Sequence, residues 1–325
     1  MKRWRSAALS PGAVLGCDPQ RRYPARMSEP RPPGPAPAKD FSSDLVVTPD
    51  GTSLRVVVRD RGEKIPYLLV HGLASNARLW DGVGLRLAEA GHPSVAVDQR
   101  GHGESDKVDH GFDFATLVTD LETVIRSTVG RPVIVAGQSW GGNVVLELAA
   151  DRPDLVAGVV CVDGGFIKLS ESFPDWSSVE RQLAPPRLSG MAAVDLEAGM
   201  RAGLTGFPPA AIEAQLANFE ILTDGTVRQR LSFDRHMTIL RFLWEHDPDE
   251  LSTRVHQPVM VIAALGGAPG HTERVQGFAG RLSRGSVVWM DAHHDMHAQR
   301  PEDIGDLLLR FADEVVTTPP GGGAL

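Results

Sequence analysis

The stretch VIVAGQSWGG at residues 133–142 constrains the fold more than any other part of this chain. Its first four residues predict a short strand, residues 137–141 a sharp turn, and the residues from Gly142 onward a helix. The glycines of this G-x-S-x-G pattern stand where side chains would collide as the chain reverses, so Ser139 is exposed at the apex. Amide groups at the start of the helix lack intrahelical partners and can stabilise negative charge. The alternative is an ordinary strand-to-helix turn, since glycine and serine are common.

Length and charge narrow the class of protein. The 325 residues, 42% hydrophobic and 23% charged, are typical of a soluble globular protein with one large core or two domains. No apolar run approaches the roughly 18 residues of a membrane-spanning helix, so we expect no membrane span and a cytoplasmic location. The formal net charge is −8, but the first 39 residues carry +6, which leaves −14 for the remainder. Such an acidic body argues against nucleic acid as a partner.

The two ends of the chain differ in composition from the rest. Residues 1–40 are basic and rich in proline and arginine, so we expect them to be disordered, because they cannot bury enough apolar surface to offset ordering. Met27 is an alternative start of translation. The segment that ends at Cys17 resembles a lipoprotein signal, but its apolar stretch is short and is broken by Pro11. We expect a flexible tail at residues 317–325. Cys161 lies in an apolar run and is predicted to be a small buried hydrophobe.

From residue 41 the pattern becomes regular. Residues 44–47 and 54–59 flank a turn and predict a β-hairpin. Near-continuous apolar runs then predict strands buried on both faces, as in a parallel sheet. Helical patterns separate most of these runs, so the alternation predicts a doubly wound, mostly parallel α/β sheet. The runs are 67–70, 94–97, 133–136, 159–162, 259–263 and 286–290, and the expected helix faces are Leu79/Val83/Leu87, Leu117/Leu121/Ile125, Val144/Leu148 and Ile304/Leu308/Phe311.

Residues 166–255 break this alternation. Ile212, Leu216 and Phe219 have helical spacing, and residues 235–246 form another helical run. We interpret the segment as a helical cap over the carboxyl ends of the strands, where doubly wound folds bind ligands, with the core at 41–165 and 256–316. Its aromatic residues suggest an apolar pocket, although helix packing on the sheet accounts for most of them. Homodimer formation through the cap is left open.

A serine nucleophile needs a base and a third group that orients the base, and after a strand–turn–helix serine the chain order is serine, acid, histidine. Residues 290–297 supply histidines at the right place, just beyond the last predicted strand.

Four motifs in order then resemble the α/β-hydrolase superfamily over residues 41–315, apart from most of the predicted cap. They are His71-Gly72-Leu73, the D-x-R-G-x-G-x-S-like segment 98–105, the serine turn 137–141, and His294 with His297 and Pro301.

The resemblance implies Ser139 as nucleophile and His294 as general base, with backbone N–H groups of Leu73 and Trp140 as the oxyanion hole. His293 stands where the family usually has glycine, so the choice of His294 depends on its spacing to His297 and Pro301. A metal site at the three histidines is disfavoured because no H-E-x-x-H pattern accompanies them, and no cofactor or metal is expected.

The acid departs from the usual family pattern. The segment 264–270 carries no carboxylate, whereas most family members have an aspartate there. Asp163 follows the run 159–162 and precedes two glycines, so we assign it as the acid. The alternative is that Asp163 caps the turn and that Glu273, or no residue, orients the histidine. Asp291 and Asp295 are too near His294 in sequence to take this role easily.

These residues predict a serine hydrolase that cleaves a small-molecule carboxylic ester, lactone or thioester through an acyl-enzyme on Ser139. Family members with aspartate at this position, such as haloalkane dehalogenases and epoxide hydrolases, form alkyl-enzyme esters instead. Carbon–carbon bond hydrolysis, cofactor-free haloperoxidase-like chemistry and acyl transfer on the same triad are alternatives. A non-catalytic ligand receptor is a further one.

Overall fold

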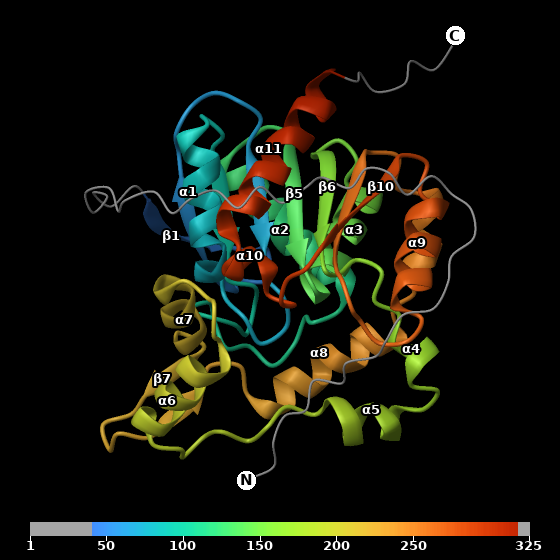
Figure 1. Ribbon diagram of the computed structural model, residues 1–325. Helices are drawn as coiled ribbons and strands as arrows, with labels where there is room; N and C mark the ends of the chain where they lie inside the picture. The colour runs from blue at the N-terminus through green and yellow to red at the C-terminus, as the bar shows by residue number, and fades with distance from the viewer. Residues whose placement is uncertain (1–40, 318–325) are drawn as a thin grey trace.

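The computed structural model describes residues 41–317, and its centre is an eight-stranded sheet in the order β1-β2-β4-β3-β5-β6-β9-β10 (Figure 1). Strand β2 is antiparallel to β1 and β4, and every other pair is parallel. The strands are β1 (Ser42–Val47), β2 (Ser53–Arg59), β3 (Tyr67–Val70), β4 (Ser94–Val97), β5 (Val133–Gln138), β6 (Val156–Val162), β9 (Val259–Ala264) and β10 (Gly285–Met290). The predicted doubly wound, mostly parallel sheet is therefore confirmed, and each strand lies within three residues of its predicted bounds.

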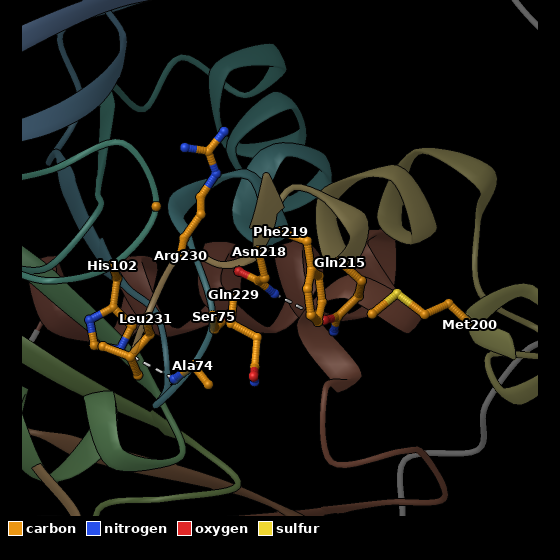
Figure 2. A pocket seen from close by; sticks show the side chains of 11 residues that line it. Ala74, Ser75, His102, Met200, Gln215, Asn218, Phe219, Gln229, Arg230 and Leu231 are labelled. Carbon is orange, nitrogen blue, oxygen red and sulfur yellow. Dashed lines mark hydrogen bonds between the residues drawn. The ribbon is translucent and has the colours of Figure 1, made fainter. Parts of the chain in front are cut away.

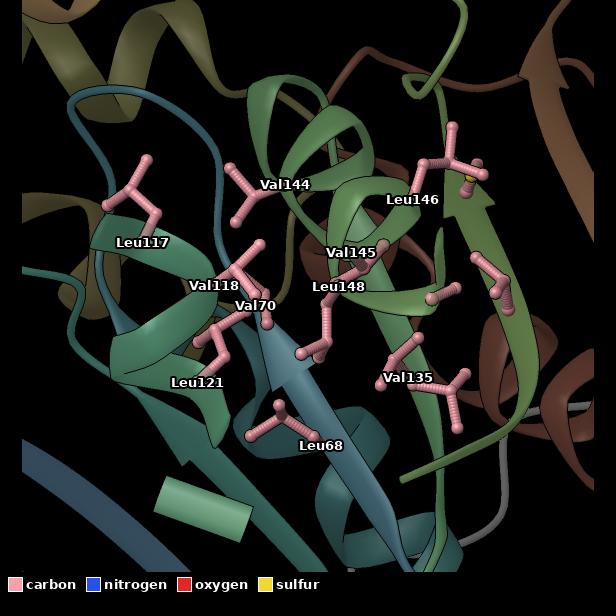
Figure 3. Packing of buried hydrophobic residues seen from close by; sticks show 14 of the residues in the cluster. Leu68, Val70, Leu117, Val118, Leu121, Val135, Val144, Val145, Leu146 and Leu148 are labelled. Atoms are coloured by element: carbon pink, nitrogen blue, oxygen red, sulfur yellow. The ribbon is translucent and has the colours of Figure 1, made fainter. Parts of the chain in front are cut away.

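Side chains of the central strands alternate between two buried layers. Leu68 and Val70 of β3 face one layer, whereas Tyr67 and Leu69 face the other. Figure 3 shows α2 and α3 against the first layer, where Leu117 and other residues cover β3 and β5. This layer contains α2 (Phe114–Thr128), α3 (Trp140–Asp151) and α9 (His271–Arg281), and the opposite layer contains α1 (Asp81–Glu89), α10 (Met296–Gln299) and α11 (Pro301–Thr317). Helices on both faces explain why the strands are apolar throughout.

Helix boundaries differ from the predictions in three places. Leu79 belongs to a separate 3₁₀ turn, η1 (Ala77–Trp80), instead of the helix of Val83 and Leu87. Helix α3 begins at Trp140, two residues earlier than predicted. Helix α11 includes Thr317, one residue beyond the predicted end of the core. Cys161 is buried and free. The predictions for Cys17, Met27 and the two terminal tails lie outside the described residues.

Between β6 and β9 the chain adds no strand to the main sheet. We call residues 166–255 the insert, and Figure 1 shows its helices gathered below the sheet. Phe219 was predicted on a helix face, but it begins a strand, because the chain turns back there into a two-stranded hairpin. The elements are α4 (Leu169–Ser172), α5 (Trp176–Leu183), α6 (Ala193–Gly203), α7 (Pro209–Leu216), β7 (Phe219–Ile221), β8 (Val227–Gln229), α8 (Phe233–Glu245) and η2 (Pro248–Thr253).

A buried ion pair fixes the loop after β4. The Arg100 side chain is fully buried, and its Nε and Nη2 atoms each donate to an Asp120 carboxylate oxygen at 2.7 Å. Arg100 also donates to Asp50 at 3.0 Å. Because charged groups are costly to bury alone, each partner depends on the other. This pair therefore joins the loop to α2.

We predict that Asp120→Asn lowers the free energy of unfolding by about 3 kcal/mol, because it leaves much of the buried Arg100 charge uncompensated. Glu122→Gln on the same helix is the matched control. Glu122 pairs with Arg126 and Arg152 near the surface, so its loss should cost less than about 1 kcal/mol. Urea denaturation followed by circular dichroism measures both values. Equal losses in the two variants would contradict the prediction.

Candidate active site

Ser139 occupies a strained turn between β5 and α3. Its backbone lies at φ 52° and ψ −125°, in a region that non-glycine residues rarely adopt. A Cβ atom on Gly137 would lie 2.2 Å from the Gly141 carbonyl oxygen, and one on Gly141 would lie 2.5 Å from the His71 carbonyl oxygen. Glycine at both positions is therefore required by the close approach of the backbone. The turn is the predicted strand–turn–helix arrangement with the serine at its apex.

Asp163 lies immediately after β6, beside the serine turn. Its backbone also has a positive φ, 45°, and a Cβ atom on the next residue, Gly164, would lie 2.1 Å from the Ser139 carbonyl oxygen. The Asp163 amide donates to the Ile262 carbonyl at 2.7 Å. Its Oδ1 accepts the backbone N–H of Ala264 at 3.0 Å. Both backbone and carboxylate of Asp163 are thus held by β9.

His294 lies in the loop after β10, and its Nδ1 atom is 2.6 Å from Asp163 Oδ2. Gln138, next to the serine, donates its side-chain amide to the His294 carbonyl at 3.2 Å. Donation from Nδ1 to the carboxylate leaves the Nε2 lone pair available as a base. Ser139 and His294 line one cavity of about 150 Å³, which we call the catalytic cavity. Its other lining residues are Leu73, Ala74, Ser75, Gln138, Gln215 and Asp295.

Two buried histidines fix the loop that carries Leu73. His71 Nε2 accepts the Gln99 amide at 3.0 Å, and its Nδ1 donates to the Gly72 carbonyl at 2.7 Å. His102 Nε2 accepts the Ala74 amide at 3.2 Å, which holds Ala74 at φ 58°. Burial lowers the pKa of both rings, so both are neutral and can accept these hydrogen bonds. Residues that follow β4 therefore hold the loop that carries Leu73 in place.

The predicted oxyanion-hole residues come from two different segments near Ser139. Leu73 lines the catalytic cavity from the loop after β3. Trp140 is the first residue of α3, where the backbone N–H has no intrahelical acceptor. Trp140 itself is buried, and His102 stacks against its ring at 5.6 Å between centroids. The structure thus brings together Ser139, Asp163, His294 and the chain segments of Leu73 and Trp140.

The remaining histidines and acids have other surroundings. His293 contacts the Phe207 ring at 5.2 Å between centroids, and the buried His297 lies 4.5 Å from the Trp80 ring. Glu273 is exposed in the first turn of α9. Across residues 41–317, no group of three or more His, Cys, Asp or Glu side chains is placed to hold a metal ion.

Sequence analysis did not identify the residues through which the insert meets the site. Gln215 of α7 donates to Asp295 at 3.0 Å, next to His294. Asn76, after β3, donates to the Ala214 carbonyl at 2.8 Å and to Asn218 at 2.6 Å. Figure 2 shows Gln215 and Asn218 with Ala74 and Ser75 around a second cavity of about 170 Å³, the inner cavity. No motif marks these amides, because their role depends on how the insert folds back.

Comparison with known proteins places this geometry in a family. Residues 66–219 match the family model described as the alpha/beta hydrolase fold. A 2-(acetamidomethylene)succinate hydrolase from Mesorhizobium japonicum is 34% identical over 128 residues, which cover 39% of this chain and 46% of that protein. A soluble epoxide hydrolase from a Corynebacterium species is 36% identical over 115 residues, covering 35% and 40%. The crystal structure of E-2-(acetamidomethylene)succinate hydrolase superposes with a TM-score of 0.69 at 24% identity, covering 84% of this chain and 99% of that one.

Residues 66–219 belong to the alpha/beta hydrolase family, and the described chain as a whole has the α/β-hydrolase fold. The matches to these two curated relatives span less than half of each relative's length. Within residues 41–317, helices that combine the length and the apolar character of a membrane span are absent.

Within this α/β-hydrolase fold, Asp163 and His294 shift each other's pKa. Partial burial of the half-exposed His294 ring disfavours the charged imidazolium, but the hydrogen bond and negative charge of Asp163 outweigh it and raise the pKa of His294 above its ordinary value. Burial likewise opposes ionisation of Asp163, yet the hydrogen bond and charge of His294 lower the pKa of that carboxyl. The pair therefore favours an ionised aspartate beside a histidine of increased basicity.

A base must be neutral to accept a proton, so activity should fall as pH falls through the raised pKa of His294. We predict that the midpoint of the acid limb of kcat/KM lies above about 6.5, the ordinary histidine value. Initial rates on an activated ester from about pH 5 to 9 would measure it. A midpoint well below 6.5 would contradict the assigned pair.

Proposed function

We propose that this α/β-hydrolase is a serine hydrolase that cleaves a small-molecule carboxylic ester, lactone or thioester through an acyl-enzyme on Ser139. The observation that carries the proposal is the 2.6 Å contact between His294 and Asp163, next to a serine held at φ 52° in the same cavity as the histidine. A histidine oriented by a carboxylate beside a strained, partly exposed serine is the arrangement that acyl transfer needs.

In the proposed mechanism, the Ser139 hydroxyl oxygen attacks the acyl carbon while His294 Nε2 takes its proton. The N–H groups of Leu73 and Trp140 stabilise the resulting oxyanion. When the tetrahedral intermediate collapses, the imidazolium of His294 gives the proton to the leaving alkoxide or thiolate. His294 then takes a proton from water, and the hydroxide attacks the acyl-enzyme to release the acid and restore Ser139. Asp163 stays ionised throughout and stabilises the imidazolium.

The nucleophile distinguishes this proposal from the reaction named for one relative. A soluble epoxide hydrolase is among the similar proteins. Epoxide opening through an alkyl-enzyme ester needs a carboxylate at the position where this chain has Ser139. A serine hydroxyl instead forms an acyl ester, which a water activated by histidine can hydrolyse. This supports an acyl substrate.

We predict that a fluorophosphonate probe labels the wild-type protein and that Ser139→Ala abolishes labelling, because the probe reacts with activated serines. Ser75→Ala is the matched control, since Ser75 is the other serine that lines the catalytic cavity. Intact mass spectrometry measures the adduct. Equal labelling of wild type and Ser139→Ala would exclude Ser139 as the nucleophile.

Asp163→Asn should lower kcat by about 10³- to 10⁴-fold, because an amide at this position favours the wrong histidine tautomer. Asp291→Asn is the control, since Asp291 is exposed and lies three residues from His294. Turnover of an activated ester measures both variants, with thermal unfolding as a check on folding. Near-wild-type turnover in Asp163→Asn would overturn the acid assignment.

A further inference from the structure

A larger cavity of about 710 Å³ lies on the insert side of the protein, and its walls are strongly basic. We call it the cationic pocket. Glu220 is the one carboxylate among its lining residues in the described chain. The basic residues that line it are Lys107, Arg187, Arg228, Arg230 and Arg235. This concentration of positive charge contrasts with the net charge of residues 40–325 as a whole, which is −14.

Only part of this positive charge is neutralised within the protein. Arg228 pairs with Glu220 at 2.5 Å, and Arg235 pairs with the exposed Asp109 at 2.9 Å. Within residues 41–317, no carboxylate lies at ion-pair distance from Arg187 or Arg230. The Arg187 guanidinium instead stacks on the Phe233 ring at 3.7 Å from its centroid, and Arg230 Nε donates to a backbone carbonyl at 3.0 Å.

Lys107 is a further basic residue in the wall of the cationic pocket. Its Nζ atom donates to three backbone carbonyls of the loop after β4, so the ammonium is fixed in place. Burial lowers the pKa of Lys107 to about 8, and the charges of Arg230 and Arg235 act in the same direction, whereas the carboxylates of Asp98 and Asp106 oppose this shift. Like charges held together repel one another, and a bound anion would relieve that repulsion.

The cationic pocket adjoins the catalytic cavity by way of the inner cavity. Gln229 and Arg230 line both the cationic pocket and the inner cavity. Ala74, Ser75 and Gln215 line both the inner cavity and the catalytic cavity. Figure 2 shows the Arg230 side chain extending away from Ala74 and Ser75. Three adjoining cavities thus lie between Ser139 and the arginines.

From this arrangement we infer that the cationic pocket binds an anionic group, a carboxylate or a phosphate, at the far end of a substrate whose ester or thioester bond lies at Ser139. The inference rests on the proposed hydrolase function and names its substrate class. Guanidinium N–H groups pair with both anions in two-pronged geometry, and Arg187 and Arg230 have donors left for this. The neutral middle of the substrate would lie along Gln229, Asn218 and Gln215 in the inner cavity.

The experiment compares three p-nitrophenyl esters whose acyl chains match in length and end in a methyl, a carboxylate or a phosphate group. We expect kcat/KM to be higher for at least one anionic ester than for the methyl ester. Arg187→Gln and Arg230→Gln should each lower the anionic-to-methyl ratio by about tenfold, the effect of losing one charge-assisted hydrogen bond. Raising the salt concentration should lower the same ratio. The carboxylate and phosphate arms show which anion is preferred.

Arg201→Gln is the matched control, because Arg201 also lies in the insert and pairs with Glu197 and Glu213 outside the three cavities. It should leave the ratio unchanged. A ratio near one for both anionic esters, or a ratio that Arg187→Gln and Arg230→Gln do not change, would overturn the inference. Calorimetric binding of the two free anionic acids to Ser139→Ala protein is read separately from turnover. If binding occurs and depends on the arginines while no ester is cleaved, the hydrolase proposal fails and the anion site stands.

Discussion

The carboxyl ends of β5 and β6 approach each other so closely that only glycine fits between them. A Cβ atom on Gly164 would lie 2.1 Å from the Ser139 carbonyl oxygen, and one on Gly142 would lie 2.5 Å from the Gly165 amide nitrogen. This contact places the residue before Gly164, Asp163, beside the serine turn. Any larger residue would separate the two strand ends and move the carboxylate away from His294. The geometry of the site therefore depends on backbone contact before it depends on any side chain.

Side chains then hold this contact from several directions. Asn143 of α3 accepts a hydrogen bond from the Gly165 amide at 3.1 Å and donates one to the Ile167 carbonyl at 2.9 Å. Helix α3 is therefore hydrogen-bonded to the loop after Asp163. Asn143 also contacts His246 at 3.1 Å, and His246 contacts Glu147 at 3.0 Å. Since His246 follows α8, the same buried network joins the insert to the core. The loop after Asp163, helix α3 and the insert thus form one hydrogen-bonded unit.

The parts of the structure that sequence could predict are those encoded locally. Apolar runs fixed the strands, and the glycine spacing fixed the turn at Ser139, because burial and chain reversal each constrain neighbouring residues. Asp163 could be predicted as lying at a strand end, because an apolar run precedes it and two glycines follow it. The prediction for Phe219 was wrong although its spacing to Ile212 and Leu216 is that of a helix. Its pairing with Gln229 in the β7–β8 hairpin determines its conformation instead. The contacts of Asn143 and Gln215 join segments far apart in sequence, so no local sequence pattern predicts them.

The wall that the insert forms around the inner cavity is hydrogen-bonded to the loops that carry His294 and Leu73. Gln215 of α7 donates to Asp295, the residue after His294, while Asn76 and Asn218 join the other end of this wall to the loop after β3. A change in α7 would consequently alter the position of the histidine loop as well as the shape of the inner cavity. Of the basic residues of the cationic pocket, Arg228 lies on β8 and Arg230 directly after it, whereas Lys107 lies in the loop after β4. The amide of Arg230, directly after β8, donates to the Asn218 carbonyl at 2.9 Å, and Asn218 donates to Gln215, which in turn donates to Asp295. A chain of hydrogen bonds therefore runs from the β8 end of the insert to the residue after His294, so the position of the histidine loop depends on both ends of this wall.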